Sequence, residues 1–99
     1  RRHGEAFYQD VQQLFLTKAF ATTTALAAAV RNRQLNDVDS LLHAFMPAAG
    51  TLGATAIAEE CERLQTTIAG DGSDAELKLC LARINEAIRL FALSTCTQG

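Results

Sequence analysis

The chain has 99 residues, enough for one hydrophobic core, and this length excludes a two-domain enzyme with a deep interdomain cleft. Hydrophobic residues make up 48% of the sequence and charged residues 20%, a composition typical of a folded soluble domain rather than a disordered segment. The 9 basic and 11 acidic residues give a net charge of −2, without a run of Lys or Arg. We therefore expect no nucleic-acid partner and no direct contact with an anionic membrane.

The ends and the uncharged stretches of the chain bear on its organisation. We interpret residues 1–4 as a linker at the edge of a single domain, 1–99, that belongs to a longer protein. The stretch 19–30 is too short and too rich in Thr to span a bilayer, and the stretch 44–58 contains Pro47, Gly50 and Gly53. We expect a soluble cytoplasmic domain, which is compatible with a membrane-bound parent protein such as an inner-membrane sensor.

Three cysteines occur, at positions 61, 80 and 96. None forms a CxxC pair and none has a His at metal-ligand spacing, so the sequence indicates no metal site. We expect three small buried thiols in a reducing cytoplasm.

Ala and Leu dominate the sequence and strand signals are nearly absent, so we predict an all-α fold. The first helix is expected from about residue 5 to residue 32, and the run Thr22-Thr23-Thr24 could bend it. Its expected core positions recur every three or four residues: Phe7, Val11, Leu14, Phe15, Ala19 and Leu26.

The second helix should begin near Asn36 or Asp37, either of which can cap it. Pro47 lacks a backbone N–H and should kink or end this helix. Its predicted core stripe is Val38, Leu42, Phe45 and Ala49.

The third helix is expected from about residue 54 to residue 69, where Gly70-Asp71-Gly72 should stop it. The fourth should follow Ser73 or Asp74 and run to about residue 94, since Ser73 and Glu76 have the spacing of a capping box. The two stripes are Ile57, Cys61, Leu64 and Ile68, and then Leu77, Leu81, Ile84, Ile88 and Phe91. Because no pair of helices could bury its stripes alone, we predict an up-down-up-down four-helix bundle.

His43 lies well away from the apolar stripe of the second helix, at about 100° per residue. We therefore expect its imidazole to point to solvent, where the small Ala44 would leave room for another protein. Asp39, one turn earlier, either orients the imidazole or is simply solvated. The residues expected on the same face, or beside it, are Asp39, Ala44, Met46, Pro47 and Gly50.

Downstream of His43 the sequence passes through Leu52-Gly53-Ala54 to Cys61 and Leu64-Gln65. This order and spacing resembles the histidine-containing phosphotransfer (HPt) domains of bacterial two-component phosphorelays. Those domains have a His on the second helix, a small-residue stretch, a Leu-Gly-Ala turn and a third helix with Cys and Leu. The resemblance covers about residues 7–91 and implies a signal-transduction module, expected at the C-terminus of a hybrid sensor histidine kinase.

The resemblance implies that His43 is the catalytic residue of a phosphorelay carrier. Its Nε2 would accept a phosphoryl group from a receiver-domain Asp and pass the group to a response regulator. The expected partner-binding residues are Asp39, Ala44, Met46, Pro47 and Gly50. Such a carrier needs no cofactor and no ATP site of its own, in agreement with a sequence that has no Gly-rich phosphate loop.

Two positions depart from the family pattern, which usually has Lys three residues and Gly four residues after the His. This chain has Met46 and Pro47 there. Met46 cannot neutralise a phosphoryl group, and a lost charge-assisted contact is worth about 1.5–3 kcal/mol. We expect the receiver partner to supply the missing cation.

Two alternative hypotheses stay open at this point. The bundle could be a degenerate module that docks a receiver without accepting phosphate, for which Met46 and Pro47 argue. It could also be a helical dimerisation domain in which His43 is incidental. Arg31 and Arg33 are expected to complement the negative end of the first helix, the alternative being contact with a phosphoryl group.

Overall fold

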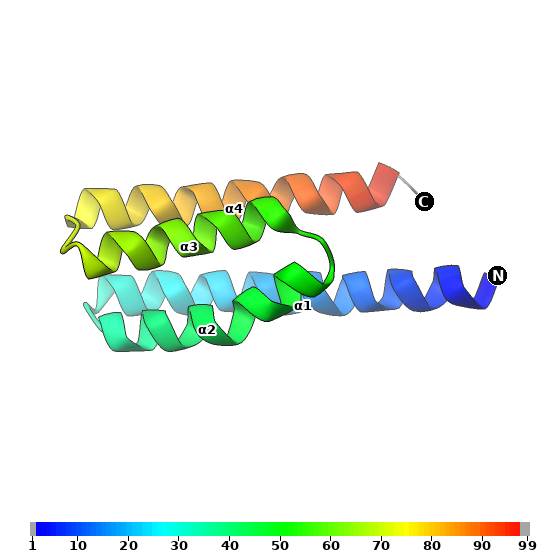
Figure 1. Cartoon of the computed structure of the whole chain (residues 1–99), viewed down its shortest axis with the longest axis horizontal. Helices are drawn as coiled ribbons and strands as arrows, with labels where there is room; N and C mark the ends of the chain where they lie inside the picture. The colour runs from blue at the N-terminus through cyan, green and yellow to red at the C-terminus, as the bar shows by residue number, and fades with distance from the viewer. Residues whose placement is uncertain (1, 98–99) are drawn as a thin grey trace.

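In the computed structural model the backbone is described for residues 2–97 and the side chains for residues 9–94. Four helices form this part of the chain: α1 (Arg2–Arg31), α2 (Leu35–Thr51), α3 (Thr55–Ala69) and α4 (Asp74–Thr97). They run alternately in opposite directions along one long axis (Figure 1). The described backbone contains no strand, so the predicted all-α, up-down-up-down bundle is confirmed.

The helices form a closed ring in which each helix touches two others. The backbones of α1 and α2, α2 and α3, α3 and α4, and α4 and α1 lie side by side, and in the described part of the chain neither diagonal pair of helices has backbones that approach each other. α2 and α4 therefore occupy opposite corners of the bundle. Their outward faces point in different directions, which leaves two separate surfaces for partners.

The buried core follows the stripes predicted from the sequence, except at Leu14 and at Val11, which is only partly buried and outside the core. On α2 the buried residues are Val38, Leu42, Phe45 and Ala49, as predicted. On α1 the core uses Phe15, Ala19 and Leu26, but Leu14 is 71% exposed and its assignment to the core is wrong. Leu14 precedes Phe15 by one residue and so points about 100° away from it. Phe7 lies outside the described side chains.

The stripes of the two later helices are confirmed in outline. Ile57, Cys61 and Leu64 are buried on α3, and Ile68 packs partly buried at its end. Leu77, Ile84 and Ile88 are buried on α4, with Leu81 and Phe91 partly buried beside them. Cys80 is also buried, and Cys96 lies outside the described side chains.

α1 is longer than expected, because the helix begins at Arg2 and includes residues 2–4 of the expected linker. It continues as one helix through Thr22-Thr23-Thr24. Within the described residues, Gln9–Arg31 is long and apolar enough to cross a membrane by length and composition alone. Phe15 and Leu26 of this helix are buried in the bundle, whereas Leu14 and Phe20 are exposed.

All three connections between helices use the same hydrogen-bonding pattern. After α1, for example, the N–H of Arg33 donates to the carbonyl of Val30, and that of Gln34 donates to the carbonyl of Ala29. This is a Schellman motif, which needs one residue in the left-handed region. That residue is Arg33 (φ 57°), Gly53 (φ 73°) and Asp71 (φ 56°) in the three connections.

These motifs decide where the helices begin and end. Gly70-Asp71-Gly72 ends α3 as predicted, with Asp71 rather than a glycine in the left-handed conformation. The N-cap of α2 is Gln34, without a side-chain hydrogen bond, so the prediction of Asn36 or Asp37 is wrong. The first Schellman motif uses the N–H of Gln34, and α2 begins at the next residue, before Asn36 and Asp37. The Ser73–Glu76 capping box is confirmed by reciprocal hydrogen bonds of 2.8 and 3.2 Å.

Pro47 lies inside α2 and does not end it, since the helix continues to Thr51. Figure 1 shows α2 changing direction partway along its length, the expected response to a proline in a helix interior. The Thr51 hydroxyl donates to the carbonyl oxygen of Pro47 at 2.9 Å and supports this last turn.

Candidate functional site

α2 fixes His43 by burying the opposite face of the helix. The ring of Phe45, two residues further on, stacks on Phe15 of α1 with ring centroids 5.3 Å apart. Phe91 of α4 packs edge-on against the same Phe15 ring at 5.6 Å. The stacked pair joins the middle of α2 to α1, and Phe91 joins the same α1 ring to α4, so the backbone that carries His43 is anchored.

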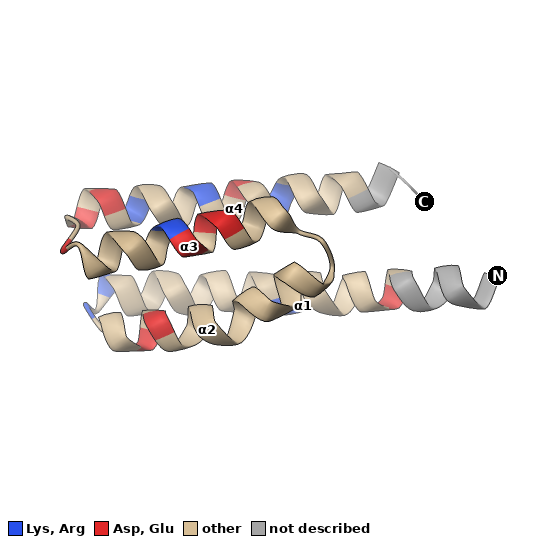
Figure 2. Ribbon diagram, in the orientation of Figure 1, with Lys and Arg blue, Asp and Glu red and all other residues tan. Residues whose placement is uncertain are grey.

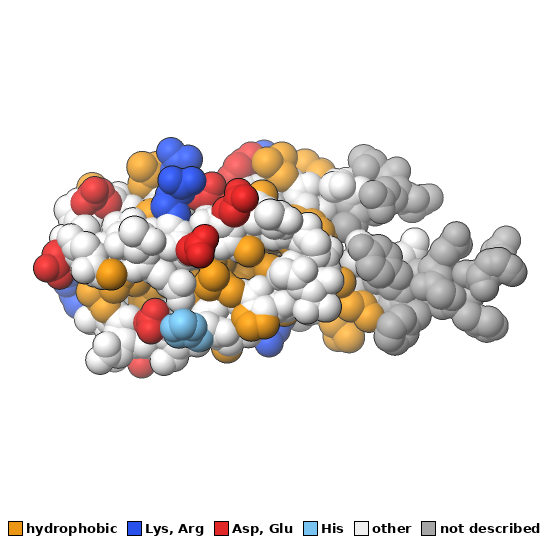
Figure 3. All heavy atoms as spheres, viewed as in Figure 1, with side chains coloured by type: hydrophobic (Ala, Val, Ile, Leu, Met, Phe, Trp, Pro, Cys, Tyr) orange, Lys and Arg blue, Asp and Glu red, His pale blue; other side chains and the backbone are white. Residues whose placement is uncertain are grey.

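The His43 side chain is 71% exposed, as predicted. Figure 3 shows a histidine standing on the open face of the molecule, next to an acidic side chain. The imidazole therefore stands within reach of another macromolecule. A neutral imidazole in this setting offers a nucleophilic nitrogen without any rearrangement of the fold.

Asp39 contacts the imidazole one helical turn before it. Its Oδ2 lies 3.4 Å from Nε2 of His43, and both side chains are largely exposed. A carboxylate here attracts a protonated ring, or accepts the Nε2 proton of a neutral ring and so orients it. Because water surrounds the pair, its attraction is weak.

The structure brings most of the predicted partner-binding residues together on the exposed side of α2. Ala44, Pro47 and Gly50 are exposed, like Asp39. A Cβ atom added at Gly50 would meet nothing within 4 Å, so the surface there is flat and open. A partner could therefore approach the backbone of α2 closely beyond His43.

Met46 is placed differently from the expectation. It is only partly exposed and packs against the hydrophobic core. At about 100° per residue, Met46 lies between the buried stripe and the face of His43. Its thioether therefore fills the edge of the core, and only part of it is accessible to a partner.

Pro47 also changes the backbone at the site. A residue at this position would normally donate its N–H to the carbonyl oxygen of His43, and proline has no such donor. The carbonyl of His43 is thus released from the usual helical bond on the exposed side of α2. The proline adds a polar acceptor and a rigid apolar ring beside the imidazole.

A shallow groove beside this face was missed by the sequence reasoning. Residues of α1 and of the end of α2 line about 280 Å³ of open space: Val11, Leu14, Phe15, Lys18, Ala48, Thr51 and Leu52. The signal was Leu14, whose apolar side chain was assigned to the core but is exposed. Lys18 brings a cation to the rim of the groove.

Other charged and reactive groups are engaged elsewhere. Arg33 forms an ion pair with Asp74, which joins the α1–α2 connection to the start of α4 at the same end of the bundle (Figure 1). Burial, with a smaller effect of Glu60, raises the pKa of the Cys61 thiol to about 11, so this cysteine stays protonated and unreactive. Among the described side chains, no group of three or more His, Cys, Asp or Glu residues could hold a metal ion.

Comparison with protein families gives one match. A family model described as Hpt domain matches residues 10–92. The matched span contains His43 and leaves out His3, the other histidine of the sequence. Comparisons with curated proteins and with solved structures find no match.

Proposed function

The chain belongs to the Hpt domain family, whose members take part in histidine phosphotransfer and interact with receiver domains, and we propose that His43 is its phosphoryl carrier. The exposed imidazole on an anchored helix is the observation that carries this proposal. His43 is also the histidine within the span that matches the family. His3 lies outside that span.

The transfer step needs only a nucleophilic nitrogen and a receiver domain. The lone pair of Nε2 attacks the phosphorus of an aspartyl phosphate, the P–O bond breaks, and its electron pair leaves on the receiver carboxylate. In the onward step, a carboxylate of the response regulator attacks phosphorus and the P–N electron pair returns to Nε2. The receiver brings the cations that neutralise the phosphoryl oxygens, which the half-buried Met46 cannot do.

Asp39 opposes this step in the arrangement observed. Its Oδ2 lies against the nitrogen that attacks, and its negative charge repels the phosphoryl oxygens. We expect Asp39→Asn to raise the transfer rate, by no more than about fivefold because both side chains are exposed to water. A loss of activity in Asp39→Asn would instead assign Asp39 a role in orienting the ring.

The receiver docks on the exposed side of α2. Ala44, Pro47 and Gly50 offer low relief around the imidazole, so the receiver active site can reach Nε2. Leu14 and Lys18 extend the surface toward α1 with an apolar contact and a positive charge. In the parent protein, we propose that the domain serves as the C-terminal module of a hybrid sensor histidine kinase in the cytoplasm.

The decisive experiment incubates the protein with a phosphorylated receiver and follows the label. We expect acid-labile, base-stable label on the wild type and on His3→Gln, and none on His43→Gln. Binding of the receiver without any label would identify a docking module, the function that Met46 and Pro47 favour as the alternative. If the receiver neither binds the protein nor labels it, a role in a phosphorelay is refuted.

Met46→Lys tests whether the missing family lysine only lowers the rate of phosphotransfer or reflects a site that no longer accepts phosphate. A lysine at the edge of the core can extend its ammonium toward solvent and restore the cation usual in the family. We expect equal or faster transfer, measured as the initial rate of label transfer from the receiver. Slower transfer in a fully folded Met46→Lys protein would contradict this interpretation.

A further inference from the structure

α4 carries a second apolar stripe on its outward face, apart from the stripe that fills the core. Leu79 is 55% exposed, Leu90 53% and Leu93 49%. Exposed leucines aligned on one face of a helix often mark a surface that contacts another protein. At about 100° per residue, the three side chains fall within one narrow sector of the helix. The buried residues Leu77, Ile84 and Ile88 point to the other side.

Two opposite charges lie within this stripe. Arg83 and Glu86 stand between Leu79 and Leu90, at spacings of four, three and four residues. The spacing is that of the a and d positions of a heptad, with the two middle positions charged instead of apolar. In Figure 3, the edge of the molecule formed by α4 shows hydrophobic side chains on both sides of basic and acidic ones.

The spacings of four, three and four residues are the same in both directions along the helix. A second copy of α4 running antiparallel can therefore pair with this face. If two copies of α4 meet antiparallel, Leu79 of each copy faces Leu90 of the other. Arg83 of each copy then faces Glu86 of the other. A two-fold axis between residues 84 and 85 satisfies both the apolar pairs and the ion pairs.

We propose that this chain forms an antiparallel homodimer through the α4 face made of Leu79, Arg83, Glu86 and Leu90. Leu93 extends the apolar stripe by one turn. A second copy carries the complementary order of charges by symmetry. The partner is therefore a second copy of this chain.

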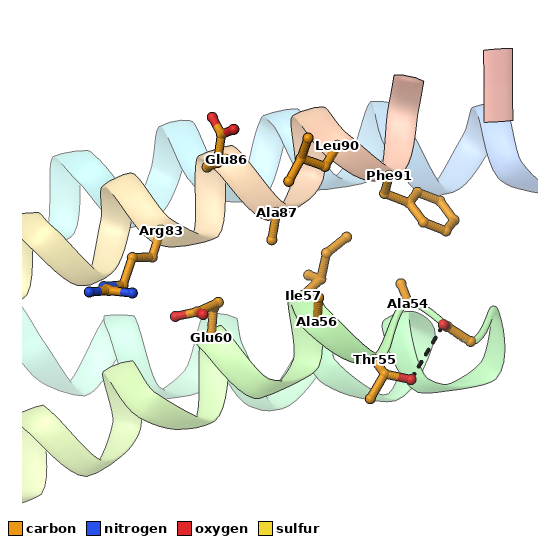
Figure 4. A pocket seen from close by; sticks show the side chains of 11 residues that line it. Ala54, Thr55, Ala56, Ile57, Glu60, Arg83, Glu86, Ala87, Leu90 and Phe91 are labelled. Atoms are coloured by element: carbon orange, nitrogen blue, oxygen red, sulfur yellow. Dashed lines mark hydrogen bonds between the residues drawn. The ribbon is translucent and has the colours of Figure 1, made fainter. Parts of the chain in front are cut away.

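The electrostatics of the face support this pairing. Among the described residues, no carboxylate lies within ion-pair distance of Arg83, and Glu60 pairs with Arg63 at 3.3 Å. Glu86 pairs with Arg89 of its own helix at 2.6 Å, so in the dimer its carboxylate bridges Arg89 and Arg83 of the other copy. Figure 4 shows Arg83 directed toward Glu60 and Glu86 directed away from α3. Glu60, Arg83, Glu86 and Leu90 border a groove of about 480 Å³ between α3 and α4. Side chains of a second copy can pack into this groove.

The dimer leaves phosphotransfer unobstructed. α2 lies diagonally opposite α4 in the ring of helices, so both copies keep His43 and its neighbours accessible. The seam is short, about 17 Å from Leu79 to Leu90 at 1.5 Å per residue, so we expect a weak, concentration-dependent dimer.

Analytical ultracentrifugation of the full chain over a range of concentrations tests the proposal. We expect Arg83→Glu and Glu86→Arg each to weaken self-association by about tenfold or more, because each variant places like charges opposite each other. Mixed in equal amounts, the two variants should associate with each other, because every facing pair is then complementary. The double variant Arg83→Glu/Glu86→Arg should dimerise like the wild type.

Matched controls address the apolar part of the seam. Leu90→Ser should abolish the dimer, whereas Leu14→Ser, which removes a still more exposed leucine from α1, should leave it intact. Circular dichroism checks that each variant keeps its helices. A wild type that stays monomeric at millimolar concentration would overturn the proposal, as would a dimer that both charge variants leave unchanged. The proposal would also be overturned if a receiver domain, and not a second copy of this chain, covered Leu90.

Discussion

The proline inside α2 gives the most direct test of the structure. Pro47 lies within a continuous helix, four residues after His43 and four before Thr51. Its ring removes the hydrogen bond to the carbonyl of His43 and crowds that carbonyl. Pro47→Ala restores the donor and relieves the contact, and the Pro47 side chain is exposed, so little packing is lost. We therefore expect the variant to be more stable than the wild type.

The magnitude follows from the position of the residue. A proline in a helix interior costs about 3 kcal/mol relative to alanine. The bundle has already adapted to the ring by bending α2, so part of this energy is not recovered (Figure 1). We expect an increase of about 2 kcal/mol in the free energy of unfolding, or roughly 8–16 °C in Tm for a domain of this size.

Urea denaturation followed by circular dichroism measures this change. Pro47→Gly is the matched control, because it also restores the N–H but brings the flexibility of glycine. It should be about 1 kcal/mol less stable than Pro47→Ala. If Pro47→Ala proved less stable than the wild type, α2 would not be a continuous helix through this position, and the placement of His43 would need revision.

Three further predictions concern single residues. Gly50→Gln should raise the free energy of unfolding by about 0.5–1 kcal/mol, because the space around Gly50 is open. The added side chain should obstruct the partner and slow phosphotransfer by about tenfold. An unchanged rate of transfer from a receiver would show that Gly50 is not part of the docking surface. Ser73→Ala should cost about 1 kcal/mol in urea unfolding by removing one half of the capping box, and an unaffected midpoint would mean that the box contributes nothing. Burial raises the pKa of Cys61 to about 11, above that of an unfolded thiol near about 8.5, so the fold favours the protonated form. This contribution, about 3 kcal/mol, should be full below about pH 8.5 and disappear toward pH 11, and the dependence should be weaker in Cys61→Ala.

Figure 2 helps to explain why the candidate site was partly visible in the sequence. Charged side chains are sparse along α2, so its outward face is marked by few features besides His43 and the carboxylates near it. The amphipathic pattern predicts the buried stripe, and the angle from that stripe then predicts the exposure of His43, Ala44 and Gly50. Both inferences depend only on the regular geometry of one helix.

The same geometry fails where a residue lies at the boundary of a stripe. Leu14 and Met46 are both hydrophobic, yet Leu14 is exposed and Met46 partly buried. The position of the neighbouring helix decides which boundary residue it covers, and the sequence of one helix does not contain that position. The left-handed conformations of Arg33 and Asp71 were likewise not predicted. The hydrogen bonds that close each connection between helices require a left-handed residue at these positions.

The sequence by itself determined the helices, their buried stripes and the exposed histidine, since all three follow from periodicity along a single segment. Only the tertiary structure decided that α2 and α4 stand at opposite corners. Helix packing sets that arrangement through contacts between segments far apart in the chain. It separates the face of His43 from the leucine face of α4, so that one surface remains free for a receiver when the other is occupied.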